Sequence, residues 1–175
     1  MNIKNKLCGV STMSQSKSMN YPALGWAIAL CAVMAVTEVL LGTKGLEWYA
    51  DIEKPAWHLP MAGWVVVVAL VYLLNGFIAY RLLSVPLRSG DRVIGLVSLG
   101  IVMLFNALWT YAFFATESTL FGVLGLIAYL APLLILQTSL WFYDRKAALF
   151  LIPYVAWVVM YDIPLYYVIW RLNGA

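Results

Sequence analysis

Charged residues are scarce in this chain of 175 residues. Asp, Glu, Lys and Arg together make up 11% of it, whereas hydrophobic residues make up 64%. A soluble domain averages about 25% charged residues, with roughly half of its residues apolar. A globule of this size leaves much of its surface in water and cannot hide such an excess of apolar side chains. The composition therefore excludes an ordinary soluble domain and predicts a protein whose solvent is the lipid bilayer.

Cysteine and histidine residues are also rare, and the net charge is small. The two cysteines, Cys8 in a polar stretch and Cys31 in an apolar run, cannot build a disulfide framework or a metal site. The formal net charge of +3 is too small to indicate nucleic acid as a partner. No internal repeat is evident, which argues against a transporter built from inverted halves.

The apolar residues form long runs rather than short alternating segments. Backbone polar groups find no partner in hydrocarbon, so a spanning element must be a helix or part of a closed barrel. Runs of about 20 largely continuous apolar residues fit helices, because barrel strands are about 10 residues long and alternate. We therefore expect an all-α, multi-pass integral membrane protein, a bundle of five transmembrane helices. The expected spans are residues 21–41, 61–83, 92–115, 119–143 and 147–172.

The rest of the chain divides into a tail and connections. Residues 1–20 are polar and carry Lys but no acidic residue, so we expect a flexible tail followed by a membrane domain over 21–175. A cleaved signal peptide is not expected, because the first apolar run is too long and lacks a small-residue cleavage site. Residues 42–60, the first loop of that domain, contain several aromatic residues and prolines, and we expect this loop to be ordered by its own packing.

The distribution of Lys and Arg predicts the orientation in the membrane. One side of the expected bundle has eight such residues, and the other side has three. By the positive-inside rule, the N-terminus would be cytoplasmic in a bacterial plasma membrane and the first loop would face outward. The eight are Lys4, Lys6, Lys17, Arg81, Arg88, Arg92, Arg145 and Lys146, and the three are Lys44, Lys54 and Arg171.

The first loop carries the most specific pattern in the chain. It reads Trp48-Tyr49-x4-Lys54-Pro55-x-Trp57-x-x-Pro60, which resembles the first loop of the TspO/MBR family of tryptophan-rich sensory proteins and translocator proteins. The resemblance continues to about Asn173, through motifs in the expected second, third and fifth spans. These motifs are Tyr72-x-x-Asn75-Gly76, Asn106-x-x-Trp109-x3-Phe113-Phe114, Ala147-Ala148-x4-Pro153-Tyr154-x-x-Trp157 and Leu165-x-Tyr167-x-x-Trp170-Arg171-x-Asn173.

This resemblance implies a compact five-helix bundle of TspO type, often a homodimer, with an aromatic-lined pocket beneath the first loop. Family members bind porphyrins, including haem, and some bind sterols, so a porphyrin or another apolar small molecule is the expected ligand and no cofactor is required. Carried over by motif, the ligand-binding residues would be Trp48, Tyr49, Pro55, Trp57, Asn106, Trp109, Phe113, Pro153, Tyr154 and Trp157.

The chain departs from the family pattern at three places. Val68 stands where the family has a pocket tryptophan, and Leu59 replaces one of the two prolines that follow Trp57. Between Trp157 and Leu165 the chain has one residue more than the family spacing. An extra residue rotates the remainder of a helix by about 100° unless a bulge absorbs it. Pro164 can supply a kink there, because a proline ring removes a helical hydrogen bond.

Two acidic residues, Glu38 and Asp162, lie inside expected spans. A carboxylate there costs several kcal/mol unless it is neutral, paired or wetted. Both should lie in the outer half of the bilayer, so they could approach one another. They either hold helices together through hydrogen bonds or handle protons in a reaction.

The residues support two functional hypotheses. The first is a membrane sensor or carrier that binds porphyrins, haem or similar flat apolar molecules; His58, the only histidine, is a candidate haem ligand, with a solvated loop side chain as the alternative. The second is a membrane-embedded enzyme in which Glu38 and Asp162 would be catalytic, either as an acid-catalysed isomerase or cyclase of a lipid or terpenoid or in porphyrin degradation. We favour the first, because no known catalytic motif is present.

Overall fold

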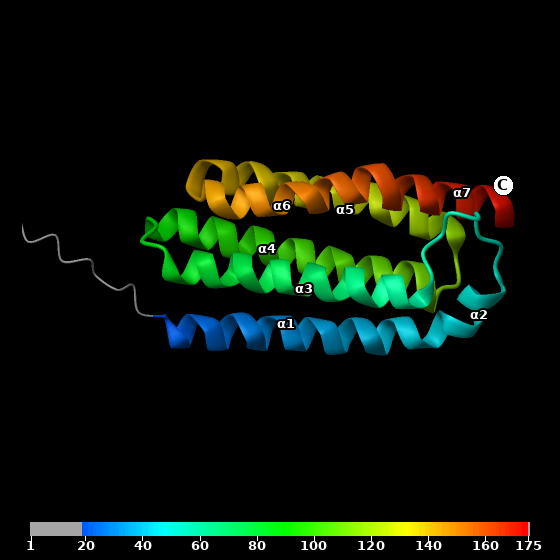
Figure 1. Cartoon of the computed structure of the whole chain (residues 1–175), viewed down its shortest axis with the longest axis horizontal. Coiled ribbons are helices and arrows are strands. Elements are labelled where there is room, and N and C mark those ends of the chain that lie inside the picture. Colours follow the sequence, from blue (N-terminus) through cyan, green and yellow to red (C-terminus); the bar gives the residue numbers. More distant parts are fainter. Residues whose placement is uncertain (1–18, 175) are drawn as a thin grey trace, which may run out of the picture.

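The structure is a computed structural model that describes residues 19–174. Five long apolar helices, each long enough to cross a membrane, run along its long axis (Figure 1). Residues 1–18 of the expected tail lie outside the described residues. The elements are α1 Tyr21–Gly42, η1 Thr43–Gly45, α2 Leu46–Asp51, α3 Met61–Ser84, α4 Ser89–Thr110, η2 Tyr111–Ala115, α5 Thr119–Tyr143, α6 Arg145–Trp157, η3 Val158–Asp162 and α7 Ile163–Gly174.

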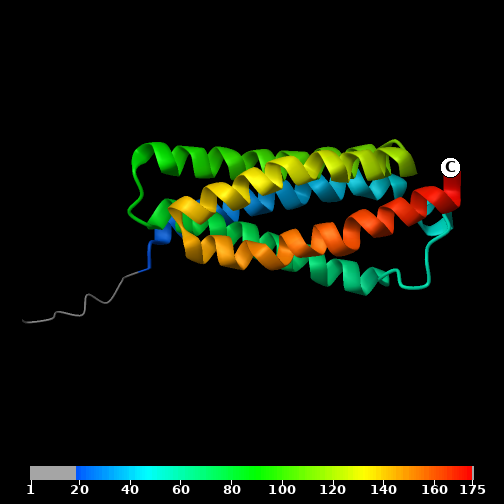
Figure 2. The ribbon, with the colours of Figure 1, turned by 90° about the horizontal axis from the view of Figure 1, so that it is seen from above.

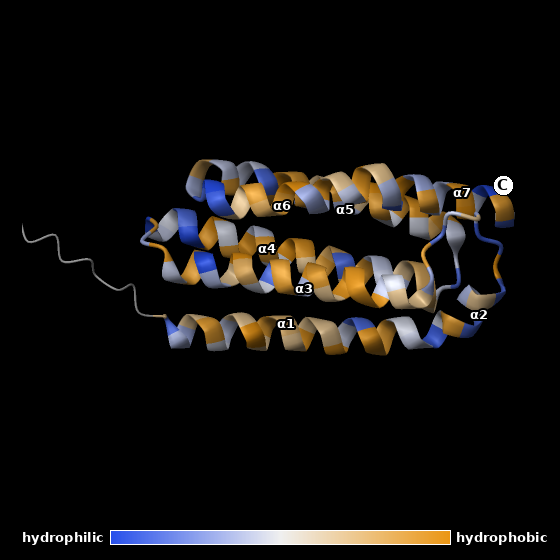
Figure 3. Ribbon diagram, viewed as in Figure 1, coloured by the Kyte–Doolittle hydropathy of each residue, from blue (hydrophilic) through white to orange (hydrophobic). Residues whose placement is uncertain are grey.

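These elements confirm the predicted five-helix membrane bundle. The first span comprises α1, η1 and α2, so the first half of the expected loop is helical and only residues 52–60 form a non-helical connection. We call residues 52–60 the lid. Figure 2 shows the lid at the same end of the bundle as the C-terminus, with the α3–α4 and α5–α6 connections at the opposite end. Hydrophobic residues dominate along all five spans (Figure 3).

Side-chain caps define several helix ends. The Asn20 side chain accepts a hydrogen bond from the Ala23 N–H at 3.1 Å, and the Ser118 hydroxyl accepts one from the Phe121 N–H at 3.3 Å. Such caps satisfy N–H groups that a helix leaves unpaired in its first turn. Asp144 caps α6 in the same way and also forms a bidentate ion pair with Arg81 of α3, at 2.6 and 2.9 Å. These contacts tie three helices together at the end away from the lid.

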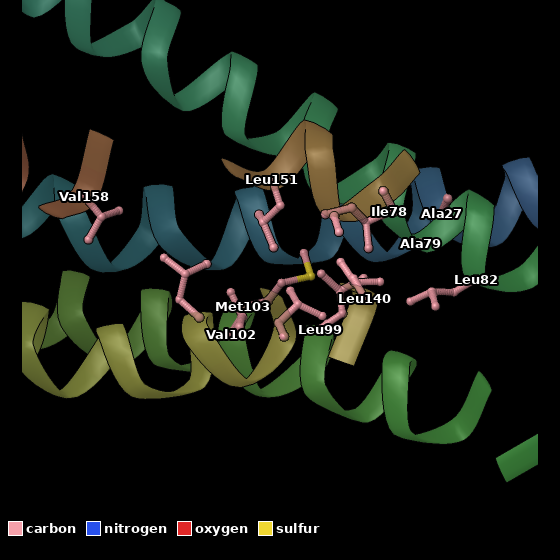
Figure 4. Close-up of a cluster of buried hydrophobic side chains, with 14 of the residues drawn as sticks. Ala27, Ile78, Ala79, Leu82, Leu99, Val102, Met103, Leu140, Leu151 and Val158 are labelled. Carbon is pink, nitrogen blue, oxygen red and sulfur yellow. The ribbon is translucent and has the colours of Figure 1, made fainter. Parts of the chain in front are cut away.

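A cluster of aliphatic side chains forms the core of the bundle in that half (Figure 4). Ala27 and Ala79 are almost fully buried where α1 packs against α3, and their small side chains let the backbones approach closely. Leu99 of α4 and Leu136 of α5 are completely buried between the helices. The packing matches that of other membrane bundles, in which van der Waals contact rather than water exclusion holds helices together.

The expected irregularity in the fifth span is present as a π-helical turn, η3, over Val158–Asp162. The Ile163 N–H reaches back five residues to the Val158 carbonyl, which accommodates one extra residue without shifting the rest of the helix. Pro164 follows directly and has no N–H to donate, so the wider turn lies where a regular helix would lose a hydrogen bond anyway. A second π-helical turn, η2, extends α4 over Tyr111–Ala115, and no pattern in the sequence predicts it.

Candidate ligand-binding site

A cavity of about 500 Å³ lies in the lid half of the bundle. All five spans contribute to its wall, which is mostly valine, leucine and aromatic side chains. The lining residues are Glu38, Val39, Gly42, Thr43, Leu46, Tyr49, Met61, Trp64, Val65, Val67, Val68, Val71, Tyr72, Asn106, Trp109, Thr110, Phe114, Leu126, Tyr129, Tyr154, Asp162 and Tyr166.

The cavity wall is incomplete between α1 and α3. Val39 of α1 lines the cavity and is also 61% exposed, and Val65 and Val68 of α3 are 63% and 46% exposed. Side chains that face both the cavity and the surface mark an opening, and this one lies on the apolar side of the bundle rather than under the lid. Val68 is the position where the family pattern has tryptophan, so the smaller side chain leaves this opening wider.

Trp109 forms one aromatic face of the cavity and is held rigidly. Its indole N–H donates to the Gly122 carbonyl at 2.9 Å, and its ring is parallel to that of Phe113 at a centroid distance of 5.7 Å. Two glycines of α5 make room for this pair. A Cβ on Gly125 would lie 2.9 Å from the Trp109 ring, and one on Gly122 would overlap Phe113. The tryptophan is therefore a fixed part of the cavity wall.

The lid is fastened to the C-terminal part of the fifth span. The Asn173 side chain exchanges two hydrogen bonds with the backbone of Glu53, both of 2.9 Å. The Leu59 N–H donates to the Tyr161 hydroxyl at 3.0 Å, and that hydroxyl donates to the Trp57 carbonyl at 3.3 Å. These long-range contacts satisfy backbone groups of the lid and give it one position over the bundle.

His58 fastens the lid to the cavity wall. Its Nε2 lies 2.6 Å from the Tyr49 hydroxyl and 3.3 Å from the Trp64 indole nitrogen. An indole N–H can only donate, so Nε2 is the acceptor and the ring is neutral in this arrangement. Partial burial and the nearby Lys54 charge both lower the pKa of His58 below its ordinary value of 6.5. A haem iron could bind Nε2 only by displacing both contacts.

Lys54 is occupied within the lid. Its ammonium donates to the carbonyls of Ile52 and Ala50 at 2.8 and 3.2 Å and lies 4.8 Å from the centre of the Tyr49 ring. It does not line the cavity. A carboxylate at the outer edge of the lid would therefore compete with these carbonyls for the ammonium.

Glu38 and Asp162 both line the cavity. The amide of Asn106 donates to Glu38 Oε1 at 2.6 Å, so this carboxyl is held in the wall. Asp162 lies at the end of the π-helical turn η3 and is 9% exposed. Its Oδ1 is buried without a hydrogen-bond partner among the described residues. Tyr129 and Tyr154, whose hydroxyls lie 2.8 Å apart, contribute to the same wall.

The structure brings four of the expected ligand-binding residues to the cavity and places six elsewhere. Tyr49, Asn106, Trp109 and Tyr154 line it. Phe113 is fully buried in a second core, where Trp48 packs edge-on against it at 5.2 Å. The remaining four, which are Pro55, Trp57, Pro153 and Trp157, are not part of the wall.

Those four lie in the lid and on α6. Trp57 is 48% exposed and packs edge-on against Tyr161, and Trp157 packs on the other side of the same ring at 4.4 Å. Pro153 is on the exposed face of α6, and Pro55 is a half-buried residue of the lid. Their position indicates a role in fixing the lid and the fifth span.

Sequence reasoning missed several aromatic residues of the wall. Trp64, near the start of α3, is typical by sequence of an interfacial belt, yet it lines the cavity and donates to His58. Phe114 belongs to the motif of the third span but was not among the expected ligand-binding residues, and Tyr166 carries no pattern that distinguishes it from other aromatic residues of the spans. The pair Gly122 and Gly125 was the available signal for Tyr129 and Leu126, because two glycines three residues apart mark the face of α5 that receives large rings.

The site has no ligand set for a metal ion. Between Met19 and Gly174, no three His, Cys, Asp or Glu side chains form a group that could hold one. What the arrangement offers is a mostly apolar cavity with rigid aromatic faces and two carboxyl groups.

The fold and this cavity define the class: an integral, multi-pass membrane protein with a cavity among five transmembrane helices. The model of the TspO/MBR family matches residues 27–171, and the chain belongs to that family. It is 32% identical to the tryptophan-rich protein TspO of Archaeoglobus fulgidus, over 73% of this chain and 80% of that protein. It is 26% identical to the protein of the same name from Chlorobaculum tepidum, over 77% and 86%, and 27% identical to the human translocator protein, over 87% and 90%.

Proposed function

We propose that this protein is a membrane receptor or carrier that binds a flat, apolar molecule, with porphyrins or haem as the leading class, in the cavity in the lid half of the bundle. The observation that carries the proposal is the cavity of about 500 Å³, lined by aromatic side chains among which Trp109 is held in place. Small-molecule sites are typically clefts of about 300–1,000 Å³, mostly apolar and with few polar groups. The relatives named tryptophan-rich protein and translocator protein are consistent with this function.

The opening between α1 and α3 supports a ligand that arrives from the membrane. A planar tetrapyrrole could enter edge first past Val65 and Val68 and stack against Trp109. No Lys, Arg or His is among the described residues that line the cavity, so the propionates of a porphyrin would remain at the opening.

A cavity-filling substitution tests the proposal. Val71→Trp adds an indole to the wall, whereas Leu70→Trp, its neighbour on α3, adds one at a position that is 59% exposed and outside the wall. Quenching of tryptophan fluorescence by protoporphyrin IX measures binding in purified protein. We expect Val71→Trp to weaken binding by about tenfold or more and Leu70→Trp to leave it within about twofold. Equal affinity of both variants and wild type would remove the cavity from the proposal.

A second candidate function is acid–base catalysis on an apolar substrate, favoured by the presence of Glu38 and Asp162 in one cavity wall. Lipid extracts from cells expressing the wild type, Glu38→Gln or Asp162→Asn can be compared by untargeted mass spectrometry. A lipid or terpenoid product that is present with the wild type and absent with both variants would support catalysis. Identical extracts from all three would argue against it.

We also propose that the N-terminus is cytoplasmic, the lid faces outward and the protein is a homodimer. Five Lys or Arg residues lie at the end opposite the lid (Arg81, Arg88, Arg92, Arg145 and Lys146), which is the bias expected on the inner side. In a cysteine-free background, an impermeant maleimide should label Ala56→Cys of the lid in intact cells and should not label Ser89→Cys. Crosslinking in native membranes measures the oligomeric state.

A further inference from the structure

The ionisable side chains of the described residues that line the cavity include acids but no bases. Glu38 and Asp162 are the two residues with acidic side chains among those that line it, and no cationic side chain of the described chain faces them there. Lys44, which directly follows the lining residue Thr43, is exposed and is not part of the wall, and Lys54 is held by lid carbonyls. Two carboxyl groups therefore lie in the wall of one mostly apolar cavity, without a cation from the described residues.

Asp162 is the more buried of the two acids. Its Oδ1 is buried without a hydrogen bond, although the residue is only 9% exposed. A buried polar atom left unpaired costs free energy, and a carboxyl within a membrane span is retained at further cost. The π-helical turn η3 ends at this residue, so the backbone irregularity of the fifth span coincides with the acid in the wall. Asp162 lines the cavity beside the Trp157 indole, whose N–H is also buried and unpaired, so a donor in the cavity would compete with that indole for the carboxyl.

Glu38 has a different environment. Asn106 of α4, a helix that packs against α1, donates to its Oε1 at 2.6 Å and fixes the carboxyl. An amide N–H supplies no charge, so it orients the carboxyl without neutralising it. Glu38 therefore lies in the wall on α1 with a neutral partner, while Asp162 contributes a second carboxyl from the fifth span.

We propose that the cavity selects apolar ligands that carry a cationic amine, with the ammonium donating to Asp162 and attracted by Glu38. This inference rests on the proposed function, because it specifies the chemistry of the ligand for the same cavity. Hydrogen bonds to a charged partner are stronger than neutral ones, and a low-dielectric site increases the difference. A ligand with a carboxylate at that end would meet two acids and no cation.

Three pyrene derivatives of similar size and shape test the inference: 1-pyrenemethylamine, 1-pyrenemethanol and 1-pyrenecarboxylic acid. Energy transfer from tryptophan to pyrene measures binding in an uncharged detergent. We expect the amine to bind the wild type about tenfold or more tightly than the carboxylic acid, with the alcohol between them. Asp162→Asn should weaken amine binding by about tenfold while leaving the affinity for the alcohol within about threefold.

Two further variants keep the test valid if Asp162→Asn does not fold: one changes the second acid of the wall, and the other is a control. Glu38→Gln should also reduce the preference for the amine over the acid. Glu47→Gln, which removes an exposed acid of α2 outside the wall, should leave that preference unchanged and so controls for general electrostatic attraction.

The outcomes separate this inference from the proposed function. If the three pyrenes bind equally to the wild type, or if the carboxylic acid binds most tightly, the selection for amines is overturned while ligand binding stands. A preference that survives both Asp162→Asn and Glu38→Gln also overturns it. If Val71→Trp fails to weaken binding of any pyrene or of protoporphyrin IX, the cavity itself is not the site and the proposed function fails.

Discussion

The two halves of the bundle use the same five spans and pack in different ways. Away from the lid, Leu82, Leu99 and Leu136 are completely buried in a continuous aliphatic cluster. Near the lid, the buried cluster is built around Tyr49, Phe113 and Tyr166, and the cavity lies beside it. Branched aliphatic side chains fill the first half, whereas the rings of the second pack edge to face against one another beside the cavity.

The comparison shows how a cavity can persist in a small bundle. The ends of the rings near the lid are held by specific contacts, such as the Trp109 indole on the Gly122 carbonyl and the Tyr49 hydroxyl on His58. The half away from the lid has one strong polar clamp, the Arg81–Asp144 ion pair, and is otherwise held by close packing. A tightly packed half thus supports a half whose interior is open.

Truncating an aliphatic side chain should therefore reduce the free energy of unfolding far more in the half away from the lid than at the cavity wall. Leu99→Ala creates a new void in the close-packed cluster, and we expect it to reduce the free energy of unfolding by about 3–5 kcal/mol. Val67→Ala, at the cavity wall, enlarges a space that already exists at a half-exposed position, and we expect a loss of about 1 kcal/mol or less. Denaturation in detergent micelles measures both.

Ligand binding should reverse the order of these two variants. Leu99→Ala, in protein that remains folded, should bind protoporphyrin IX as the wild type does, whereas Val67→Ala should change the affinity. Equal stability losses in the two variants would show that both halves are packed alike and would remove the distinction.

Breaking the Arg81–Asp144 ion pair should give the next largest loss of stability. Asp144→Asn keeps a cap for α6 but leaves Arg81 without its carboxylate, and we expect a loss of about 1.5–3 kcal/mol at neutral pH. Burial alone would raise the pKa of Asp144, but the hydrogen bonds from Arg81 and from the Ala147 N–H outweigh it and hold the pKa below its ordinary value of 3.8.

The lowered pKa sets the direction of the pH dependence. The ion pair contributes fully above about pH 4, the ordinary range for Asp, and its contribution is lost as the pH falls through the lower pKa of the folded state. The difference in stability between wild type and Asp144→Asn should therefore be constant from neutral pH down to about pH 5 and should shrink below about pH 4. A difference that grows on acidification would contradict this account.

The five spans could be predicted within a few residues because long apolar runs leave no other structure for a backbone in lipid. α1 ends at Gly42, one residue after the predicted end of the first span, but η1 and α2 follow where a loop was expected. Gly42 and Gly45 resemble the start of a loop, but the helix continues, and Gly45 is needed because a Cβ there would overlap the Phe114 carbonyl. Close contact between backbones, which sequence does not display, explains this glycine.

The cavity wall was harder to predict because π-helical turns change which side chains share a face. The extra residue before Leu165 indicated an irregularity in the fifth span, and the structure has η3 there. No such signal preceded η2, where the wider turn directs Phe113 into the core and leaves Phe114 at the cavity. The regular 3.6-residue period groups Phe113 with Asn106 and Trp109.

Substitution of Gly122, which makes room for the Trp109–Phe113 pair, should reduce stability less than the two most destabilising changes above and should also weaken ligand binding. A Cβ at Gly122 would overlap Phe113, so Gly122→Ala must displace the ring, and we expect a loss of about 1–2 kcal/mol. Because Phe113 is stacked on Trp109, the tryptophan should move as well, and protoporphyrin binding should weaken. Gly100→Ala, where a Cβ has open space, is the matched control and should leave both stability and binding unchanged.

The smallest expected effect is a pH dependence of the lid's stability. The helices away from the lid should not share it. Partial burial and Lys54 lower the pKa of His58 below 6.5, so its neutral ring holds Tyr49 and Trp64 fully above about pH 6.5. That contribution is lost as the pH falls through the lower folded value, because the open lid takes up the proton more readily. Hydrogen exchange of the lid amides, residues 52–60, should rise by about three- to tenfold between pH 7 and pH 5 after correction for intrinsic rates.

In His58→Phe the lid should exchange fast at both pH values, and the helices away from the lid should remain protected throughout. If the lid of the wild type stays equally protected at pH 5, then Asn173 and Tyr161 hold it without help from His58.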